Sequence, residues 1–327
     1  MKILLIFLLV FVIFLSGCGG NNTVTRTEFA LGTFVSVRID GMSEKAANAA
    51  LDAAFERLYE IEQIACAKNP NSNLSYLNQV GFPGRDVGIY RELFYLLKSG
   101  LYYSELTNGA FDITLGAIIE LWGIGTENAR VPTDEEIARA VENSGFENLE
   151  LVKSKRAAHF LNHRLRIDLG AIAKGYAADE MKRVLLEHGV ENALLNLGGD
   201  IITIGDNGGR GWLIGLADPL SDDPNKYCAT LRIFDQTIVT SGNYERYFMH
   251  EDKRYHHIFD RNTGFPAESG VVSATVIADS SMLADAISTA LFVNPALIDK
   301  FPDISYILID SDMNFTYSEG LELEIVQ

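Results

Sequence analysis

Two adjacent histidines, His256 and His257, and a carboxylate, Asp260, stand just ahead of a turn that contains Gly264 and Pro266. Polar side chains beside a loop are well placed for chemistry, and an imidazole can act as a general base near neutral pH. Because adjacent residues of a strand face opposite sides, we expect only one of the two imidazoles to enter a site. Asp260 is a candidate to orient that imidazole.

A carboxylate and a hydroxyl, Asp285 and Thr289, lie four residues apart in a predicted helix, so both point to the same side. They are hard oxygen ligands of the kind that Mg²⁺ binds together with waters and substrate phosphates. The spacing alone favours a solvated helix face. The rest of the helix leaves little room for such a face, because it contains the apolar residues Met282, Leu283, Ala286, Ile287, Ala290 and Leu291.

Three charged residues stand beside small residues or bends. Asp112 follows a Gly-Ala pair that lets the backbone approach a ligand closely, and its carboxylate can accept hydrogen bonds from a ring N–H or a ribose hydroxyl. A helix cap before Ile113 is an equally good interpretation of Asp112. Asp168 and Lys174 flank a further bend, where Lys174 is either a phosphate partner or a surface lysine.

Hydrophobic patterns predict the helices that must position these residues. Ser43 can cap a helix whose apolar stripe runs from Ala47 to Ala65. Thr133 and Glu136 form a capping-box pattern ahead of another apolar residue. Further helices are expected over 90–104, 172–188 and 281–292.

Apolar residues alternate over 33–39, which predicts a strand. Short apolar runs, separated by Gly, Asp and Pro, indicate antiparallel strands at 193–197, 201–204, 212–216, 230–234, 271–277, 306–309 and 323–326. Helices and strands do not alternate regularly, so the predicted fold class is α+β. The sequence is long enough for a single compact unit of two intimate lobes.

The amino terminus carries an apolar run from Ile3 to Leu15 that is too short to span a bilayer comfortably and fits a signal peptide. The following Ser-Gly-Cys resembles a bacterial lipobox and predicts cleavage before Cys18 and lipidation of its thiol. We therefore expect a signal peptide at 1–17, a lipidated tether at 18–26 and one domain at 27–327, on the extracytoplasmic or periplasmic face of a bacterial membrane. The alternative is a short anchor that is never cleaved.

The composition limits the class of partner. A formal net charge of −17 argues against nucleic acids and anionic lipids, which both select for Lys and Arg patches. The membrane should therefore be contacted through the lipid alone. Cys66 and Cys228 are either a disulfide of an oxidising compartment or two free thiols.

Five segments between about residues 31 and 291 have the residue types and order of one known family. They are Asn108–Thr114 with Leu121–Gly123, Ile167–Asp179, Asn196–Asp200, Tyr255–Pro266, and Ala284–Ala286 with Thr289. Together they resemble the ApbE family, the FAD:protein FMN transferases. The resemblance implies a T-fold-like architecture of mixed, mostly antiparallel sheets with packed helices.

The resemblance also implies an activity and a site. FMN would pass from FAD to a Thr or Ser hydroxyl of an extracytoplasmic redox protein, an electron-transport subunit, with release of AMP. Mg²⁺ would be bound by Asp285, Thr289 and the backbone carbonyl of Ala171, and His257 would be the catalytic base. The residues expected to contact FAD are Leu31, Lys68, Ala110, Phe111, Asp112, Asp168, Lys174 and Ile258.

Two positions depart from the family. Lys68 stands where the family usually has an aromatic residue, and a lysine lacks a flat surface for stacking on a ring. Leu31 replaces the more usual methionine. The loss of stacking favours a second hypothesis, an FAD pyrophosphatase that gives FMN and AMP. A third hypothesis is a non-catalytic flavin-binding lipoprotein, against which His257, Asp285 and Thr289 argue.

Overall fold

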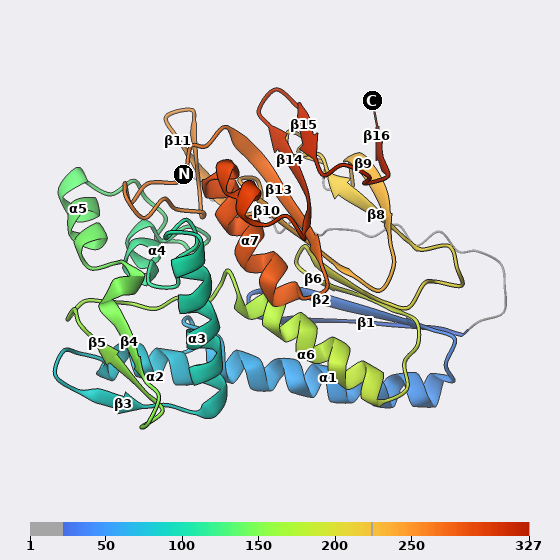
Figure 1. Ribbon diagram of the computed structural model, residues 1–327, viewed down its shortest axis with the longest axis horizontal. Coiled ribbons are helices and arrows are strands. Elements are labelled where there is room, and N and C mark those ends of the chain that lie inside the picture. The colour runs from blue at the N-terminus through green and yellow to red at the C-terminus, as the bar shows by residue number, and fades with distance from the viewer. Residues whose placement is uncertain (1–21, 224, 327) are drawn as a thin grey trace.

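The computed structural model describes residues 22–223 and 225–326 (Figure 1). The expected signal peptide and the lipidated Cys18 lie outside these residues. Strand β1 (Thr23–Ala30) begins at Thr23, so residues 23–26, which we expected in the tether, belong to a sheet instead. Within the described residues, no helix has the length and apolar composition needed to cross a membrane.

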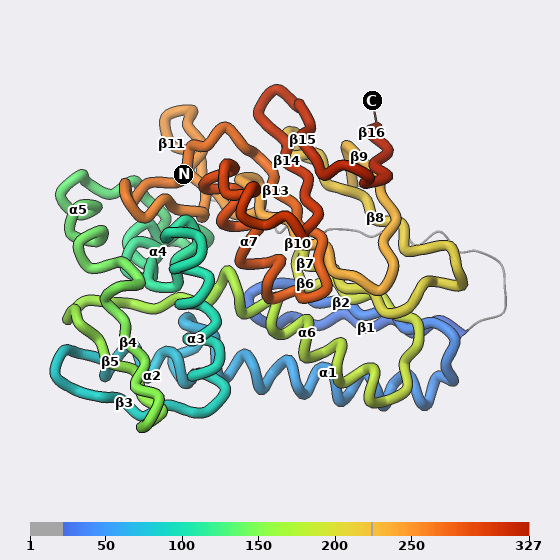
Figure 2. Tube along the Cα trace, viewed as in Figure 1, coloured from blue at the N-terminus to red at the C-terminus, as the bar shows by residue number. Residues whose placement is uncertain are grey.

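The centre of the molecule is an eight-stranded sheet in which every neighbouring pair is antiparallel. Its order is β1, β2 (Thr33–Asp40), β6 (Ala193–Leu197), β7 (Asp200–Ile204), β10 (Thr237–Gly242), β13 (Val271–Ala278), β14 (Ser305–Asp310) and β15 (Phe315–Tyr317). Figure 2 shows the amino-terminal strands in blue and the carboxy-terminal strands in red toward opposite edges of this sheet. The expected α+β class with mostly antiparallel sheets is confirmed.

Three helices cover one face of the sheet: α1 (Glu44–Ala65), α6 (Ala173–Glu187) and α7 (Ser281–Val293) (Figure 1). Helix α6 lies between α1 and α7, and α7 packs on β10 and β13. The apolar stripe predicted for α1 is buried against them, and its cap Ser43 accepts the Ala46 N–H at 3.3 Å. These helices pack on the sheet to form the main hydrophobic core.

A small sheet covers the opposite face of the main sheet. It contains β16 (Leu323–Ile325), β9 (Tyr227–Ile233) and β8 (Trp212–Ala217), in that order. Trp212, Ile214 and Leu231 from this sheet bury a second apolar cluster against strands of the main sheet. Cys228 lies in this layer and Cys66 follows α1, and both are free thiols.

The second lobe lies at the left of Figure 1 and was only partly expected. It contains α2 (Asn73–Val80), α3 (Arg91–Leu106), α4 (Gly116–Trp122), α5 (Asp134–Glu142), and a sheet of β3 (Asp86–Gly88), β5 (Ala157–Phe160) and β4 (Leu149–Val152). The predicted capping box begins α5. Residues of both lobes share one core cluster, so the chain forms a single unit.

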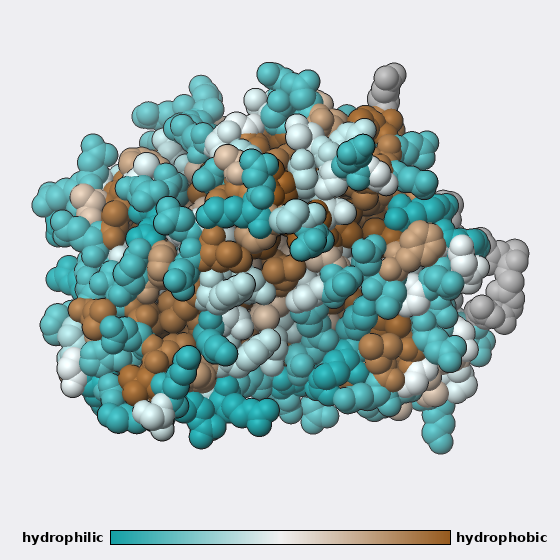
Figure 3. All heavy atoms as spheres, in the orientation of Figure 1, coloured by the Kyte–Doolittle hydropathy of each residue, from teal (hydrophilic) through white to brown (hydrophobic). Residues whose placement is uncertain are grey.

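A hairpin of β11 (Tyr247–His250) and β12 (Lys253–His256) connects the main sheet to the second lobe. Trp122 of α4 contacts Tyr255, Phe259 and Phe265, and its indole N–H donates to the Gly264 carbonyl at 2.9 Å. The segment of the two histidines is thereby held between the lobes. Hydrophilic residues cover much of the outer surface around this core, as Figure 3 shows for one face.

Candidate active site

Lys174, in the first turn of α6, places its ammonium group between two buried carboxylates. Its Nζ lies 3.1 Å from Asp200 Oδ2 and 3.2 Å from both carboxylate oxygens of Asp285. Asp200 begins β7 and Asp285 lies in α7, and they are 1% and 3% exposed. Three elements far apart in sequence therefore meet at this cluster.

Buried charges require compensation, and the cluster provides it within itself. Burial alone would lower the pKa of Lys174, but the charges of Asp200 and Asp285 raise it above its ordinary value. Burial, and then the neighbouring charge of Asp285, raise the pKa of Asp200 well above its usual range. The lysine therefore stays charged and offsets negative charge within the cluster.

Asp285 accepts a hydrogen bond from the first turn of α6. The Gly175 N–H donates to Asp285 Oδ2 at 3.1 Å. Gly175 is the third residue of α6, so its N–H is one of the amino-terminal donors that have no acceptor within the helix. The Ala171 carbonyl stands before the helix and, in residues 22–223 and 225–326, accepts no backbone hydrogen bond. Its oxygen is available to a ligand.

Thr289 stands one turn after Asp285 on α7, as the sequence predicted. Its hydroxyl lies 3.2 Å from that of Ser241 on β10, and the Ser241 hydroxyl also lies 2.9 Å from that of Ser288. A carboxylate, a hydroxyl and a free carbonyl are all hard oxygen donors, so they fit Mg²⁺. The described residues contain no group of three or more His, Cys, Asp and Glu side chains suited to a metal, so a bound ion would depend on the two neutral oxygens.

His257 is oriented by a backbone carbonyl. Its Nδ1 and its backbone N–H lie 3.2 and 3.1 Å from the carbonyl oxygen of Arg246. A carbonyl only accepts, so Nδ1 carries the proton and Nε2 presents a lone pair. The expectation that Asp260 orients this ring is wrong, because the Asp260 carboxylate accepts from the N–H and side-chain amide of Asn262.

His256 turns into the protein. Its Nε2 donates to the Ala267 carbonyl at 3.1 Å, its Nδ1 accepts from the Ile258 N–H at 3.3 Å, and its ring meets Phe292 edge to face. Both ring nitrogens are thus used, and only His257 keeps one for chemistry. Burial lowers the pKa of His256 to about 4. The pKa of His257 is lowered to about 3, mainly by burial and in addition by the positive charge of Arg246.

Two further charged residues, Glu245 and Arg246, belong to this site and were missed from the sequence. Burial raises the pKa of Glu245 to about 7, although the positive charges of Arg246 and Lys174 act to lower that pKa. The guanidinium of Arg246 donates to the Gly32 carbonyl at 3.3 Å. The sequence signal was the Thr240–Tyr244 turn, which ends directly before this pair.

Comparison with known proteins agrees with this arrangement. A profile of the ApbE family matches residues 31–303, most of the chain. The chain belongs to the ApbE family. The match begins at Leu31, the first residue of the turn that Arg246 holds through Gly32, and includes the lysine, carboxylate and histidine positions described above.

Individual ApbE relatives support the assignment. The chain is 34% identical to an FAD:protein FMN transferase of Treponema pallidum, over 93% of this chain and 90% of that protein. It is 33% identical to an FAD:protein FMN transferase of Klebsiella pneumoniae, over 83% of each. The fold matches the crystal structure of the Thermotoga maritima ApbE protein, with a TM-score of 0.82 and 35% identity over 91% of this chain and 97% of that one. It also matches the flavin transferase ApbE of Vibrio cholerae, with a TM-score of 0.79 and 28% identity over the same shares.

Asp112, in the first of the ApbE-like segments, is enclosed by protein donors. Its Oδ1 accepts from the Thr114 hydroxyl and N–H at 2.6 and 2.8 Å, and its Oδ2 accepts from the Phe146 N–H at 3.0 Å, with Arg261 at 3.5 Å. Burial raises the pKa of Asp112 despite these bonds. The carboxylate closes a local turn with Thr114 and caps no helix, because α4 begins at Gly116 after Leu115, so the helix-cap interpretation is wrong. Contact with a ligand would need these donors to be exchanged.

The other residues expected to contact FAD divide by exposure. Ala110, Phe111 and Ile258 are buried in the apolar clusters, so their backbone groups are what a ligand would meet. The half-buried Asp168 accepts from the Gly170 N–H at 2.8 Å and so shapes the bend before Ala171.

The departures from the ApbE pattern lie at turns. Leu31 has a positive φ of 50° and donates its N–H to Glu62 at 2.7 Å. Lys68 is exposed in the turn after α1 and gives the site no enclosing surface.

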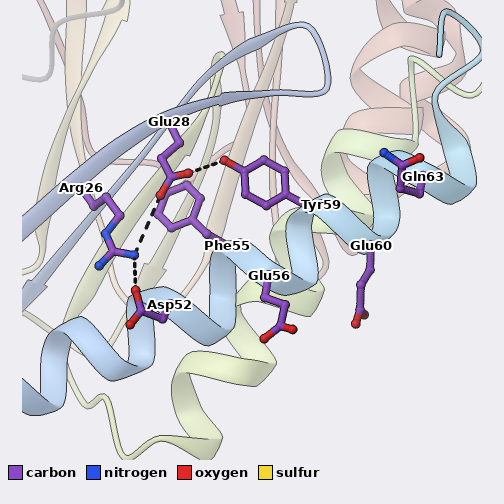
Figure 4. Close-up of a pocket in the computed structure, with 8 residues that line it drawn as sticks. All are labelled: Arg26, Glu28, Asp52, Phe55, Glu56, Tyr59, Glu60 and Gln63. Atoms are coloured by element: carbon purple, nitrogen blue, oxygen red, sulfur yellow. Dashed lines mark hydrogen bonds and ion pairs between the residues drawn. The ribbon is translucent and has the colours of Figure 1, made fainter.

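An open groove of about 530 Å³ lies elsewhere, between β1 and α1 (Figure 4). Arg26 in this groove is paired with Asp52 at 2.6 Å and lies 3.9 Å from Glu28, which also accepts from the Tyr59 hydroxyl. Glu56 and Glu60 add further negative charge. An acidic surface disfavours phosphates, so this groove is not the dinucleotide site.

Proposed function

We propose that this chain is a Mg²⁺-dependent FAD:protein FMN transferase, which moves FMN from FAD to a Thr or Ser hydroxyl of an acceptor redox protein and releases AMP. The observation that carries the proposal is the buried Asp285 carboxylate, which binds the Gly175 N–H at the amino end of α6, where the Ala171 carbonyl accepts no backbone hydrogen bond. The names of the Treponema and Klebsiella relatives support it.

Three oxygens would hold the metal: the Asp285 carboxylate, the Thr289 hydroxyl and the Ala171 carbonyl. Mg²⁺ bound there would offset negative charge on the diphosphate and on the departing phosphate. Because Asp285 is the single carboxylate of this set, it determines the affinity for the ion. The Lys174 ammonium, now 3.2 Å from Asp285, would keep Asp200 as its partner at 3.1 Å.

The transfer exchanges one P–O bond for another. The acceptor hydroxyl oxygen attacks the phosphorus on the FMN side, the bond to the AMP phosphate breaks, and the hydroxyl proton needs an acceptor. His257 is suited to this role because the Arg246 carbonyl holds its proton on Nδ1 and leaves Nε2 free. Its lowered pKa keeps the ring neutral throughout the physiological range.

The pyrophosphatase is the second candidate, and the exposure of Lys68 favours it, since no aromatic ring at this position shields the flavin. Incubation of the protein with FAD and Mg²⁺, with and without an acceptor domain, separates the candidates. AMP with a flavinylated acceptor indicates a transferase. AMP with free FMN in both mixtures indicates a hydrolase, and unchanged FAD indicates a non-catalytic flavin-binding protein.

We infer the cellular location of the protein from its amino-terminal sequence. The lipobox-like sequence before Cys18 supports a membrane-anchored lipoprotein whose acceptors are extracytoplasmic electron-transport subunits. The lipid would be its only membrane attachment, and the charge of −17 gives no surface for nucleic acid.

A further inference from the structure

Arg246 is a cation at the site without an anionic partner. It lies in the loop between β10 and β11 and is exposed. In the part of the chain that the structure describes, its guanidinium forms no ion pair and donates one hydrogen bond, to the Gly32 carbonyl at 3.3 Å. Several guanidinium N–H donors therefore remain for an anion. In a chain with a net charge of −17, such a group calls for an explanation.

The position of Arg246 is fixed from three sides. The turn of Leu31 and Gly32, which has φ angles of 50° and 73°, presents the carbonyl that receives its Nη2. Its Cδ lies 3.9 Å from the place that a Cβ on Gly125 would take. Its own carbonyl binds both the backbone and the ring of His257. The backbone of Arg246 therefore holds the His257 imidazole, while the Gly32 carbonyl holds the Arg246 guanidinium.

The other charged groups of the site do not supply a free positive charge for a substrate. Lys174 is already engaged by Asp200 and Asp285. Glu245 adds a third carboxyl group that both Lys174 and Arg246 influence. A diphosphate entering here brings further negative charge, so it requires positive charge that is not yet paired.

We propose that Arg246 is a substrate-binding residue whose guanidinium binds the diphosphate of FAD. The inference rests on the proposed function, because it takes FAD as the substrate of this site. A planar guanidinium can contact two phosphate oxygens at once, which fixes the orientation of the diphosphate as well as its charge. The Gly32 carbonyl would pre-orient the side chain for that contact.

The test is a fluorescence titration of the full chain with FAD and with riboflavin, in the presence of Mg²⁺, for the wild type and Arg246→Gln. Arg254→Gln is the matched control, because Arg254 lies on the hairpin that directly follows Arg246 and has its guanidinium 4.4 Å from the Tyr247 ring centroid. We expect Arg246→Gln to weaken FAD binding on the order of 10- to 100-fold, and Arg246→Lys to recover part of it. Riboflavin, which has no phosphate, should bind Arg246→Gln and the wild type alike.

A second readout is the salt dependence of FAD affinity, which should become shallower in Arg246→Gln and stay unchanged in Arg254→Gln. If riboflavin binds too weakly to measure, the salt dependence alone tests whether Arg246 binds the diphosphate. Equal losses for FAD and riboflavin, or an unchanged affinity and salt slope for FAD, would overturn the inference. The same holds if Arg246→Gln impairs only the acceptor reaction, since the residue would then bind the acceptor. Failure of the wild type to release AMP would instead reject the proposed function.

Discussion

The ammonium group of Lys174 lies 3.2 Å from both carboxylate oxygens of Asp285, at the position where a cation is needed. Lysine therefore offsets the buried charge of Asp285 while Asp200 holds the same ammonium from the other side. Because the Gly175 N–H also binds Asp285, this carboxylate connects α6 to α7 as well as serving the site. Removal of the Asp285 carboxylate should therefore weaken metal binding more than removal of the polar side chains beside it.

Asp285→Ala should lose Mg²⁺-dependent turnover of FAD by at least on the order of 10²-fold, the loss typical when a group that stabilises developing charge is removed. Thr289→Ala should be milder, because a water can replace a neutral hydroxyl. Ser288→Ala is the control, since it removes an adjacent hydroxyl of the same helix that is not in the ligand set. Initial rates over a Mg²⁺ titration measure the effect. Wild-type turnover by Asp285→Ala at low Mg²⁺ would contradict the metal assignment.

Gly175→Ala should destabilise the fold, because a Cβ at this position would overlap the backbone carbonyl of Ser281 at the start of α7. The two helices would have to separate, at a cost on the order of 1–3 kcal/mol in the free energy of unfolding. Gly88→Ala is the control, since no atom lies within 4 Å of the Cβ it would add. Urea unfolding compares the two variants. Equal stabilities would show that α6 and α7 do not depend on this contact.

Much of the main lobe was predictable because its elements have long, regular patterns. Helices α1, α6 and α7 begin and end within about two residues of the expected positions. Asp285 and Thr289 were expected on one helix for the same reason. The short strands β3, β11 and β15 were not predicted, since three or four residues carry too little periodicity.

The centre of the site was less predictable, because its contacts are between distant elements or involve the backbone. Asp200 appears in the sequence only as the end of the Asn196–Asp200 segment, and the meeting of β7 with α6 is what brings it to Lys174. The Arg246 carbonyl that orients His257 leaves no side-chain signal. Asp260 was the nearby carboxylate in the sequence and was therefore expected to orient the imidazole, but it accepts a hydrogen bond from Asn262 in a local turn instead.

Cys18→Ser should release the protein from membranes or block its processing, because the predicted lipid is the proposed attachment. Membrane fractionation and the migration of the precursor and mature forms on a gel test this. Cys66→Ser is the matched control, since Cys66 is a free thiol of the folded domain. If Cys18→Ser fractionates and migrates like the wild type, the lipoprotein hypothesis is wrong.

The two histidine variants should fail in different ways. His257→Ala should lose flavinylation of the acceptor on the order of 10²–10⁴-fold while it keeps its fold and its affinity for FAD. His256→Ala should instead lower the free energy of unfolding, by roughly 2–4 kcal/mol, because it leaves a cavity against Phe292 and unpairs the Ala267 carbonyl. Chemical unfolding and FAD titration accompany the activity assay. Loss of FAD binding in His257→Ala would make His257 a ligand contact and not a base.

The stability of the fold should depend on pH through His256. Burial lowers the pKa of His256 to about 4, whereas an unfolded chain holds a histidine near ~6.5. Below the unfolded value the unfolded state binds more protons, so the stability contributed by the neutral ring is lost as the pH falls toward the folded value. His257 acts in the same direction. Glu245 opposes both, because its raised pKa of about 7 makes the folded state the better proton acceptor down to the unfolded value of 4.5.

A variant without the His256 imidazole isolates its contribution from these opposing groups. The free energy of unfolding of the wild type relative to His256→Leu should fall by about 2 kcal/mol between about pH 7.5 and about pH 5, since that interval includes roughly 1.5 pH units below the unfolded pKa. Urea unfolding of both proteins at the two pH values measures the difference. NMR titration of the wild-type imidazole protons provides an independent value if His256→Leu does not fold. A pH-independent difference, or a ring that titrates near ~6.5, would show that His256 is not held neutral by burial.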